Sequence, residues 1–127
     1  MKYAILKETE YGFDEAIAKI TDSLKKEGFG ILTRIDIDEK FKEKLGIDFK
    51  KYAILGACNP QNAYKALTEE ETIGLLLPCN IVVYEKGDKT VVAAIKPTAA
   101  MMVSDNAKVA EIAKEIEKKL ETAVENV

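Results

Sequence analysis

Two β-branched runs in the second half of the chain constrain the fold most. Residues 80–85 (NIVVYE) and 90–95 (TVVAAI) flank the four residues 86–89 (KGDK). Runs rich in valine and isoleucine that are separated by so short a glycine-containing loop are typical of a β-hairpin. The sequence therefore predicts an antiparallel pair of strands here, and a sheet that contains the pair.

Two long helices are predicted from apolar residues that recur at spacings of three and four. The first covers residues 13–27, and Gly28 ends it because glycine accepts the left-handed conformation that closes a helix. The second covers residues 106–124, with Ser104 or Asp105 as its expected cap. Its apolar face is formed by Val109, Ile112, Ala113, Ile116, Leu120 and Ala123.

Shorter patterns predict three more strands, over residues 2–7, 30–36 and 52–57. Residues 30–36 alternate between Ile31, Thr33 and Ile35 on one side and Leu32 and Arg34 on the other, which is typical of a strand with one side in water.

Two short helices are also predicted. Asp38 can cap a helix over residues 39–45 in which Phe41 and Leu45 form the apolar stripe. A second helix, over residues 60–68, is expected to turn three side chains inward, those of Ala63, Tyr64 and Leu67.

These elements follow the order β-α-β-α-β-α-β-β-α along one sheet. Because the strand at residues 30–36 has only one apolar side, we expect helices on one face of the sheet only. The predicted fold is α+β, a two-layer α/β domain with about five strands and the two long helices packed side by side on one face. The 127 residues fit a single domain, residues 1–127.

Both cysteines of the chain lie in two similar corners. Short apolar runs end at Cys58-Asn59 and at Cys79-Asn80, and a proline adjoins each dipeptide. Asn59 can cap a helix that begins with the following proline, while the proline before Cys79 favours an extended entry into the next strand. Since neighbouring strand ends bring the corners together, we expect Cys58 and Cys79 to share one pocket.

The motifs GACNP, at residues 56–60, and GLLLPCN, at residues 74–80, resemble the domain of unknown function 302 family. Weaker similarities occur at residues 28–30 and 45–46, and Lys96 departs from the acidic or amide residue expected before the next proline. The resemblance spans nearly the whole chain and implies a two-layer α/β domain that tends to pair as a homodimer. It implies no activity, because the family has none assigned.

The composition excludes several classes of function. The absence of histidine removes imidazole-based triads and most catalytic zinc sites. The net charge of −3 comes from 22 acidic and 19 basic residues that are mixed along the chain, so nucleic acid is not an expected partner. No run approaches the roughly 18 apolar residues of a membrane-spanning helix, and we expect a cytoplasmic protein with no membrane partner.

The two cysteines allow three interpretations. They are small buried hydrophobes, or a reactive thiol pair in which Cys58 is activated by the start of a helix, or metal ligands. A metal site would need two more soft ligands, from methionines or a second subunit, and we predict neither a metal nor a cofactor. Nearby, Tyr64 and Met101 are candidate pocket residues, although filling the core is the commoner use of both residue types.

Three functions stay open at this point. The first is a dimeric module that binds a small ligand, possibly an anion, at the two corners, where helix-end amides favour negative charge. Its candidate residues are Cys58, Asn59, Cys79, Asn80, Tyr64 and Met101. The second is a thiol-dependent enzyme or sulfur carrier that uses Cys58, with Cys79 as the resolving thiol. The third is a structural protein without a small-molecule site.

Overall fold

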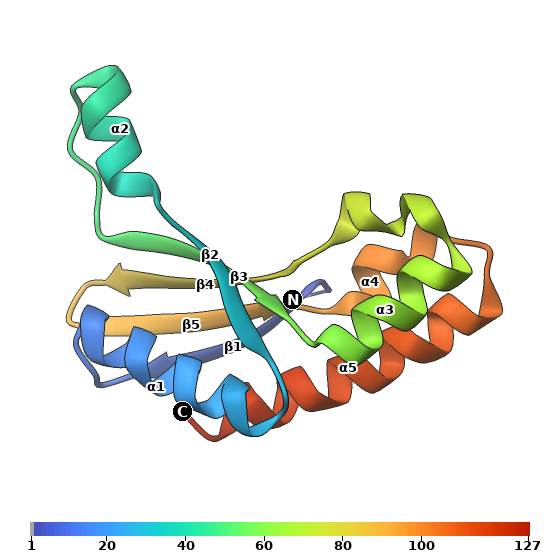
Figure 1. Ribbon diagram of the computed structural model, residues 1–127. Helices are drawn as coiled ribbons and strands as arrows, with labels where there is room; N and C mark the ends of the chain where they lie inside the picture. Colours follow the sequence, from blue (N-terminus) through green and yellow to red (C-terminus); the bar gives the residue numbers. More distant parts are fainter. Residues whose placement is uncertain (1) are drawn as a thin grey trace.

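A computed structural model describes residues 2–127 and contains one five-stranded sheet (Figure 1). The strands lie in the order β1-β5-β4-β3-β2, and every neighbouring pair is antiparallel. Their bounds are Ala4–Thr9 for β1, Gly30–Asp36 for β2, Tyr52–Cys58 for β3, Cys79–Lys86 for β4 and Lys89–Ile95 for β5.

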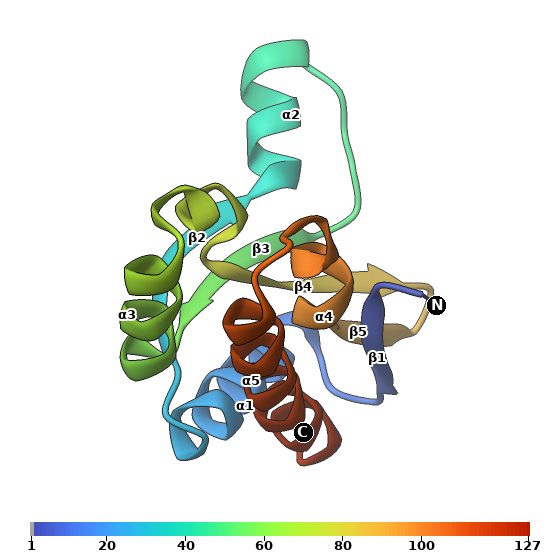
Figure 2. The ribbon, with the colours of Figure 1, turned by 90° about the vertical axis from the view of Figure 1, so that its right-hand side faces the viewer.

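The two long helices, α1 (Phe13–Lys26) and α5 (Ala107–Glu125), contact each other and cover the same face of the sheet (Figures 1 and 2). A shorter helix, α3 (Pro60–Glu69), packs beside α5. On the opposite side, α2 (Ile37–Leu45) rises away from the sheet (Figure 2). The predicted α+β fold, with one sheet and both long helices on one face, is confirmed.

The hairpin is confirmed with a loop shorter than predicted. Lys86 and Lys89 are opposite each other at the ends of β4 and β5, so only Gly87 and Asp88 lie between them. Gly87 has a φ of 62°, in the left-handed region that two-residue hairpin loops require. The chain turns here with a glycine where a side chain would introduce strain.

The predicted apolar face of the last helix forms the centre of the core. Its six residues are all buried against α1 and the sheet, with Leu120, Val109 and Ala123 fully inaccessible. Ser23 on α1 donates a hydrogen bond to the Ala123 carbonyl, and the Lys7 ammonium on β1 donates to the Glu125 and Val127 carbonyls at 2.8 and 2.7 Å. Burial of a leucine of this kind contributes about 1.5–3 kcal/mol, so the buried face of α5 stabilises the packing of this helix in the core.

Strand β2 departs from the predicted alternation because it contains a bulge. Ile31 is opposite Ala57, but Thr33 is opposite Gly56, so the register shifts between the two. A bulge places one extra residue in the strand and reverses the side on which later side chains lie. Ile31 consequently packs against the core, whereas Ile35 is 43 % exposed.

The helix predicted at residues 39–45 forms, but its apolar stripe does not face the core. None of the residues of α2 is buried, and Leu45 is 64 % exposed. Asp36 occupies the cap position in place of Asp38, whose carboxylate instead accepts a hydrogen bond from the Tyr52 amide at 3.2 Å. Gly46 closes the helix with a φ of 67°.

Several element ends differ from the sequence prediction by one or two residues. Strand β1 begins at Ala4, and the cap of α5 is Asn106, whose side chain accepts hydrogen bonds from the Lys108 and Val109 amides. Three short helical segments were not predicted. They are η1 (Glu71–Leu76), α4 (Pro97–Ala100) and η2 (Met101–Val103).

Candidate functional site

The two Cys-Asn corners meet at one end of the central strands. Ala57 on β3 is directly opposite Cys79 on β4, so Cys58 and Cys79 stand at neighbouring strand ends. The proline before Cys79 follows Leu77, which adopts the predicted extended conformation, with φ −118° and ψ 155°. Both cysteines are among the residues that line a single cavity, but they form no disulfide and no close pair.

This cysteine cavity has a volume of about 250 Å³. Its lining comes from strand ends, from α3, from α5 and from the segment before β4, and it is almost wholly apolar. The lining residues are Phe29, Leu32, Ala57, Cys58, Asn59, Ala63, Leu67, Leu77, Pro78, Cys79 and Ile116. A concave apolar surface with a few polar or reactive atoms is the usual form of a small-molecule site.

Asn59 lines the cysteine cavity and makes two side-chain hydrogen bonds. Its side-chain oxygen accepts a hydrogen bond from the Asn62 amide at 3.3 Å, which confirms the predicted cap of α3. Its side-chain nitrogen donates to the Glu27 carbonyl, at the end of α1, at 3.4 Å. Asn59 is buried, and its two hydrogen bonds connect the end of α1 to the start of α3 next to Cys58.

The two thiols have different surroundings. Cys58 is partly exposed, whereas Cys79 is only 5 % exposed and belongs to the hydrophobic core. Burial, together with the neighbouring Cys58 thiol, raises the pKa of the Cys79 thiol from its ordinary 9.0 to about 11. Both cysteines are free. Cys79 is therefore a protonated thiol at neutral pH, and Cys58 is the thiol that solvent reaches.

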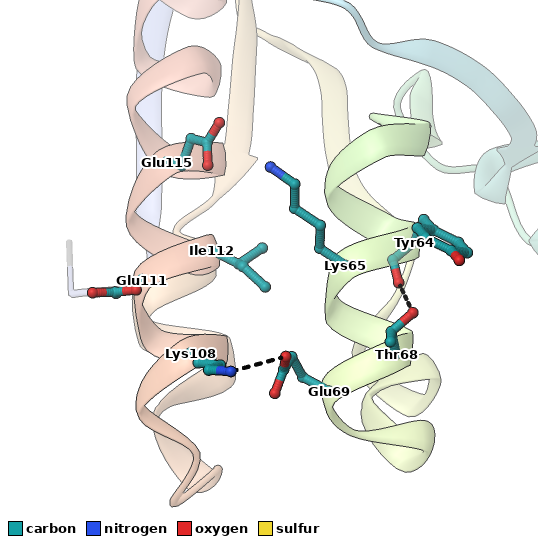
Figure 3. A pocket seen from close by; sticks show the side chains of 8 residues that line it. All are labelled: Tyr64, Lys65, Thr68, Glu69, Lys108, Glu111, Ile112 and Glu115. Carbon is teal, nitrogen blue, oxygen red and sulfur yellow. Dashed lines mark hydrogen bonds and ion pairs between the residues drawn. The ribbon is translucent and has the colours of Figure 1, made fainter.

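Three of the predicted site residues lie elsewhere. Asn80 is exposed on the open face of the sheet, where it lines a different hollow. Met101 is 3 % exposed and packs in the core, which is its commoner use. Tyr64, predicted to face inward, is 75 % exposed, and Figure 3 shows its ring pointing away from α5. Of the candidate site residues, Cys58, Asn59 and Cys79 line the cysteine cavity.

A larger hollow of about 410 Å³ lies between α3 and α5 (Figure 3). Its walls carry lysine and glutamate side chains, including the Lys108–Glu69 ion pair at 3.7 Å, over the side chain of Ile112. Exposed ion pairs of this kind contribute little and are well solvated. We interpret this hollow as a charged surface groove, because it contains none of the buried polar or reactive groups that the cysteine cavity has.

Sequence reasoning missed three parts of the cavity wall. Phe29 follows α1, Leu32 lies in the bulge of β2, and Ile116 lies on α5; they are 29, 26 and 37 positions from the nearest cysteine in the sequence. The apolar spacing of α5 marks Ile116 as a core residue but does not say which strand end it meets. The GFG motif at residues 28–30 was the one available signal for Phe29.

Within residues 2–127, no three histidine, cysteine, aspartate or glutamate side chains gather closely enough to hold a metal ion. No helix in the same range is both long and apolar enough to cross a membrane.

Comparison with known proteins gives one consistent answer. The family described as "Domain of unknown function DUF302" matches residues 5–127. The crystal structure of an uncharacterized conserved protein DUF302 from Bacillus stearothermophilus superposes with a TM-score of 0.91 at 36% sequence identity. The match covers 97% of this chain and 96% of that one. No curated protein matches the chain. The chain belongs to the DUF302 family.

Proposed function

We propose that this protein is a homodimeric binding module that holds a small, largely apolar molecule in the cysteine cavity. The observation that carries the proposal is the cavity itself. About 250 Å³ of space is lined by apolar side chains, with the Cys58 and Cys79 thiols at the strand ends. Such a volume accepts a molecule of roughly benzene size or somewhat larger.

The groups around the cavity favour an apolar ligand over the anion considered from the sequence. A helix start binds anions through its unpaired amides. At the start of α3, however, the Asn62 and Ala63 amides donate to Asn59, and Pro60 has no amide hydrogen. The amide groups that would bind an anion are therefore largely occupied.

The unequal thiols support a second function, in which Cys58 acts as an attacking or sulfur-carrying thiol. Cys58 is reached by solvent, and it lies next to the capped start of α3. Burial raises the pKa of the Cys79 thiol to about 11 and keeps it protonated, so this function falls to Cys58. Two free cysteines also suit a reducing compartment, and we propose a cytoplasmic location on that basis.

Titration with toluene, followed by amide NMR, tests the binding function. We expect the amide signals of residues 57–59, 63 and 67 to shift in a saturable way, and phosphate to leave them unchanged. The control is Ala63→Leu, which fills the cavity from α3 and should abolish the shifts. Saturable shifts with phosphate but not with toluene would contradict the proposal.

Alkylation with iodoacetamide tests the thiol function. Labelling of the native protein across about pH 6–9, read by peptide mass, should modify Cys58 well before Cys79. Cys58→Ser should remove the early labelling. Equal and slow labelling of both thiols would leave Cys58 as a structural residue and would remove the second function without affecting the first.

A further inference from the structure

We infer that a second copy of this chain covers the open face of the sheet, and that the α2 segment of each subunit lies over the η1 end of its partner. This inference rests on the homodimer in the proposed function and specifies the surfaces that form it. Three features of the structure carry it: the open face, the projecting segment and the distribution of charge.

An apolar band crosses the whole open face of the sheet. The strand registers place five side chains directly opposite one another, one from each strand, on the face away from α1 and α5. They are Ile35, Ile54, Val82, Ala93 and Leu6. Leu6 and Ile35, at the two ends of this band, are 46 % and 43 % exposed. Opposite side chains on one face of a sheet form a continuous surface, so this band is a ready apolar contact area.

The arm, residues 37–51, rises on the same side of the sheet (Figures 1 and 2). A chain of aromatic contacts, Phe41–Phe49–Tyr52–Tyr84, joins it to the open face, with the Tyr52 and Tyr84 rings stacked at 5.2 Å. The arm adds no buried residue from α2, yet it exposes Leu45 by 64 % and Ile47 by 50 %. The three aromatic pairs therefore hold the arm in a fixed position. In a single subunit, its apolar side chains Leu45 and Ile47 are left exposed to solvent.

Further exposed apolar residues occur on η1 and η2, which lie toward the end of the sheet opposite the arm (Figure 1). Leu75 is 87 % exposed, Met102 is 76 % and Val103 is 77 %. A twofold axis that runs across the strands would therefore bring the arm of each subunit onto these residues of its partner. A twofold axis along the strands would instead place arm against arm.

Charge distinguishes the two arrangements. The arm contains five lysines and four acidic residues, and ion pairs within it join Lys40 to Glu43 and Lys42 to Asp48. The run Glu69-Glu70-Glu71 leads into η1; its Glu69 pairs with Lys108 and its Glu70 accepts a hydrogen bond from Ser104. Opposite charges across an interface favour association and like charges disfavour it. The arm therefore suits the acidic η1 end better than a second arm, and the contact is made twice in an isologous dimer.

Analytical ultracentrifugation tests this surface. We expect the wild-type protein to have a mass of twice 14.1 kDa. Leu6→Glu and Leu45→Glu should each weaken the dimer at least about 100-fold, because each change acts twice across the twofold axis. The matched control is Leu32→Glu, at a leucine that is 66 % exposed on the edge strand and lines the cysteine cavity, which should leave the dimer intact.

Disulfide trapping tests the arrangement. Leu45→Cys together with Leu75→Cys should form a covalent dimer through these two positions, identified by peptide mass, whereas Leu45→Cys alone should not. A wild-type monomer at about 100 μM would overturn the inference, as would dissociation by Leu32→Glu alone, which would indicate pairing of the β2 edges. If a monomeric Leu6→Glu variant still shows the toluene shifts at the cysteine cavity, ligand binding does not depend on the dimer. The binding function and the proposed interface can then be judged separately.

Discussion

Replacement of Asn59 by alanine tests whether this one side chain connects α1 to α3 beside the cysteine cavity. Alanine removes the cap of α3, which costs about 1 kcal/mol, and the hydrogen bond to the Glu27 carbonyl, which is long at 3.4 Å and is worth about 0.5–1 kcal/mol. We therefore expect the free energy of unfolding to fall by about 2 kcal/mol. For a domain of this size the melting temperature should drop by about 8 °C.

The matched control is Asn106→Ala, because Asn106 caps α5 in the same way but connects no second helix. It should lower the free energy of unfolding by only about 1 kcal/mol, as measured by urea denaturation. Asn59→Ser keeps an oxygen that can cap α3 and lacks the amide nitrogen that reaches Glu27, so it should fall between wild type and Asn59→Ala. Equal losses for Asn59→Ala and Asn106→Ala would refute the connecting role.

Two further predictions follow from the same region. Gly56→Ala should lower the free energy of unfolding by about 1–3 kcal/mol, because the new methyl group would meet the Thr33 hydroxyl and lie 2.7 Å from the Pro78 ring, while Gly30→Ala has open space and should be nearly neutral in the same thermal melt. Because the pKa of Cys79 is near 11 when folded and near 9.0 when exposed, its contribution to stability is complete below about pH 9 and is lost as pH rises through about 11. Between about pH 9 and 11, the free energy of unfolding of the wild type should therefore fall by about 2–3 kcal/mol more than that of Cys79→Ala, as measured by urea denaturation at each pH. The same pH dependence in both proteins would contradict the raised pKa of Cys79.

The features that the sequence predicted well depend on local physics. The hairpin follows from two β-branched runs and a glycine turn, and the buried face of α5 follows from helical spacing. The cap by Asn59 and the proline after it need only neighbouring residues.

The features that the sequence missed depend on contacts between distant segments. The spacing of Phe41 and Leu45 is that of a buried stripe, but the arm carries them away from the core. The bulge in β2 is invisible to an alternation rule, because only the register with β3 reveals the extra residue. Tyr64 lies two positions from each of the buried residues of α3, Asn62 and Ala66, so its side chain projects from the opposite side of the helix.

Diffraction from crystals pressurised with xenon tests the cysteine cavity most directly, because xenon enters apolar cavities without needing polar partners. The account predicts xenon density among Leu67, Cys79 and Ile116, and no such density in the Ala63→Leu variant. Wild-type crystals in which this space holds no xenon, with Leu67 and Leu77 closed over the thiols, would contradict the claim that the two cysteines line a ligand cavity.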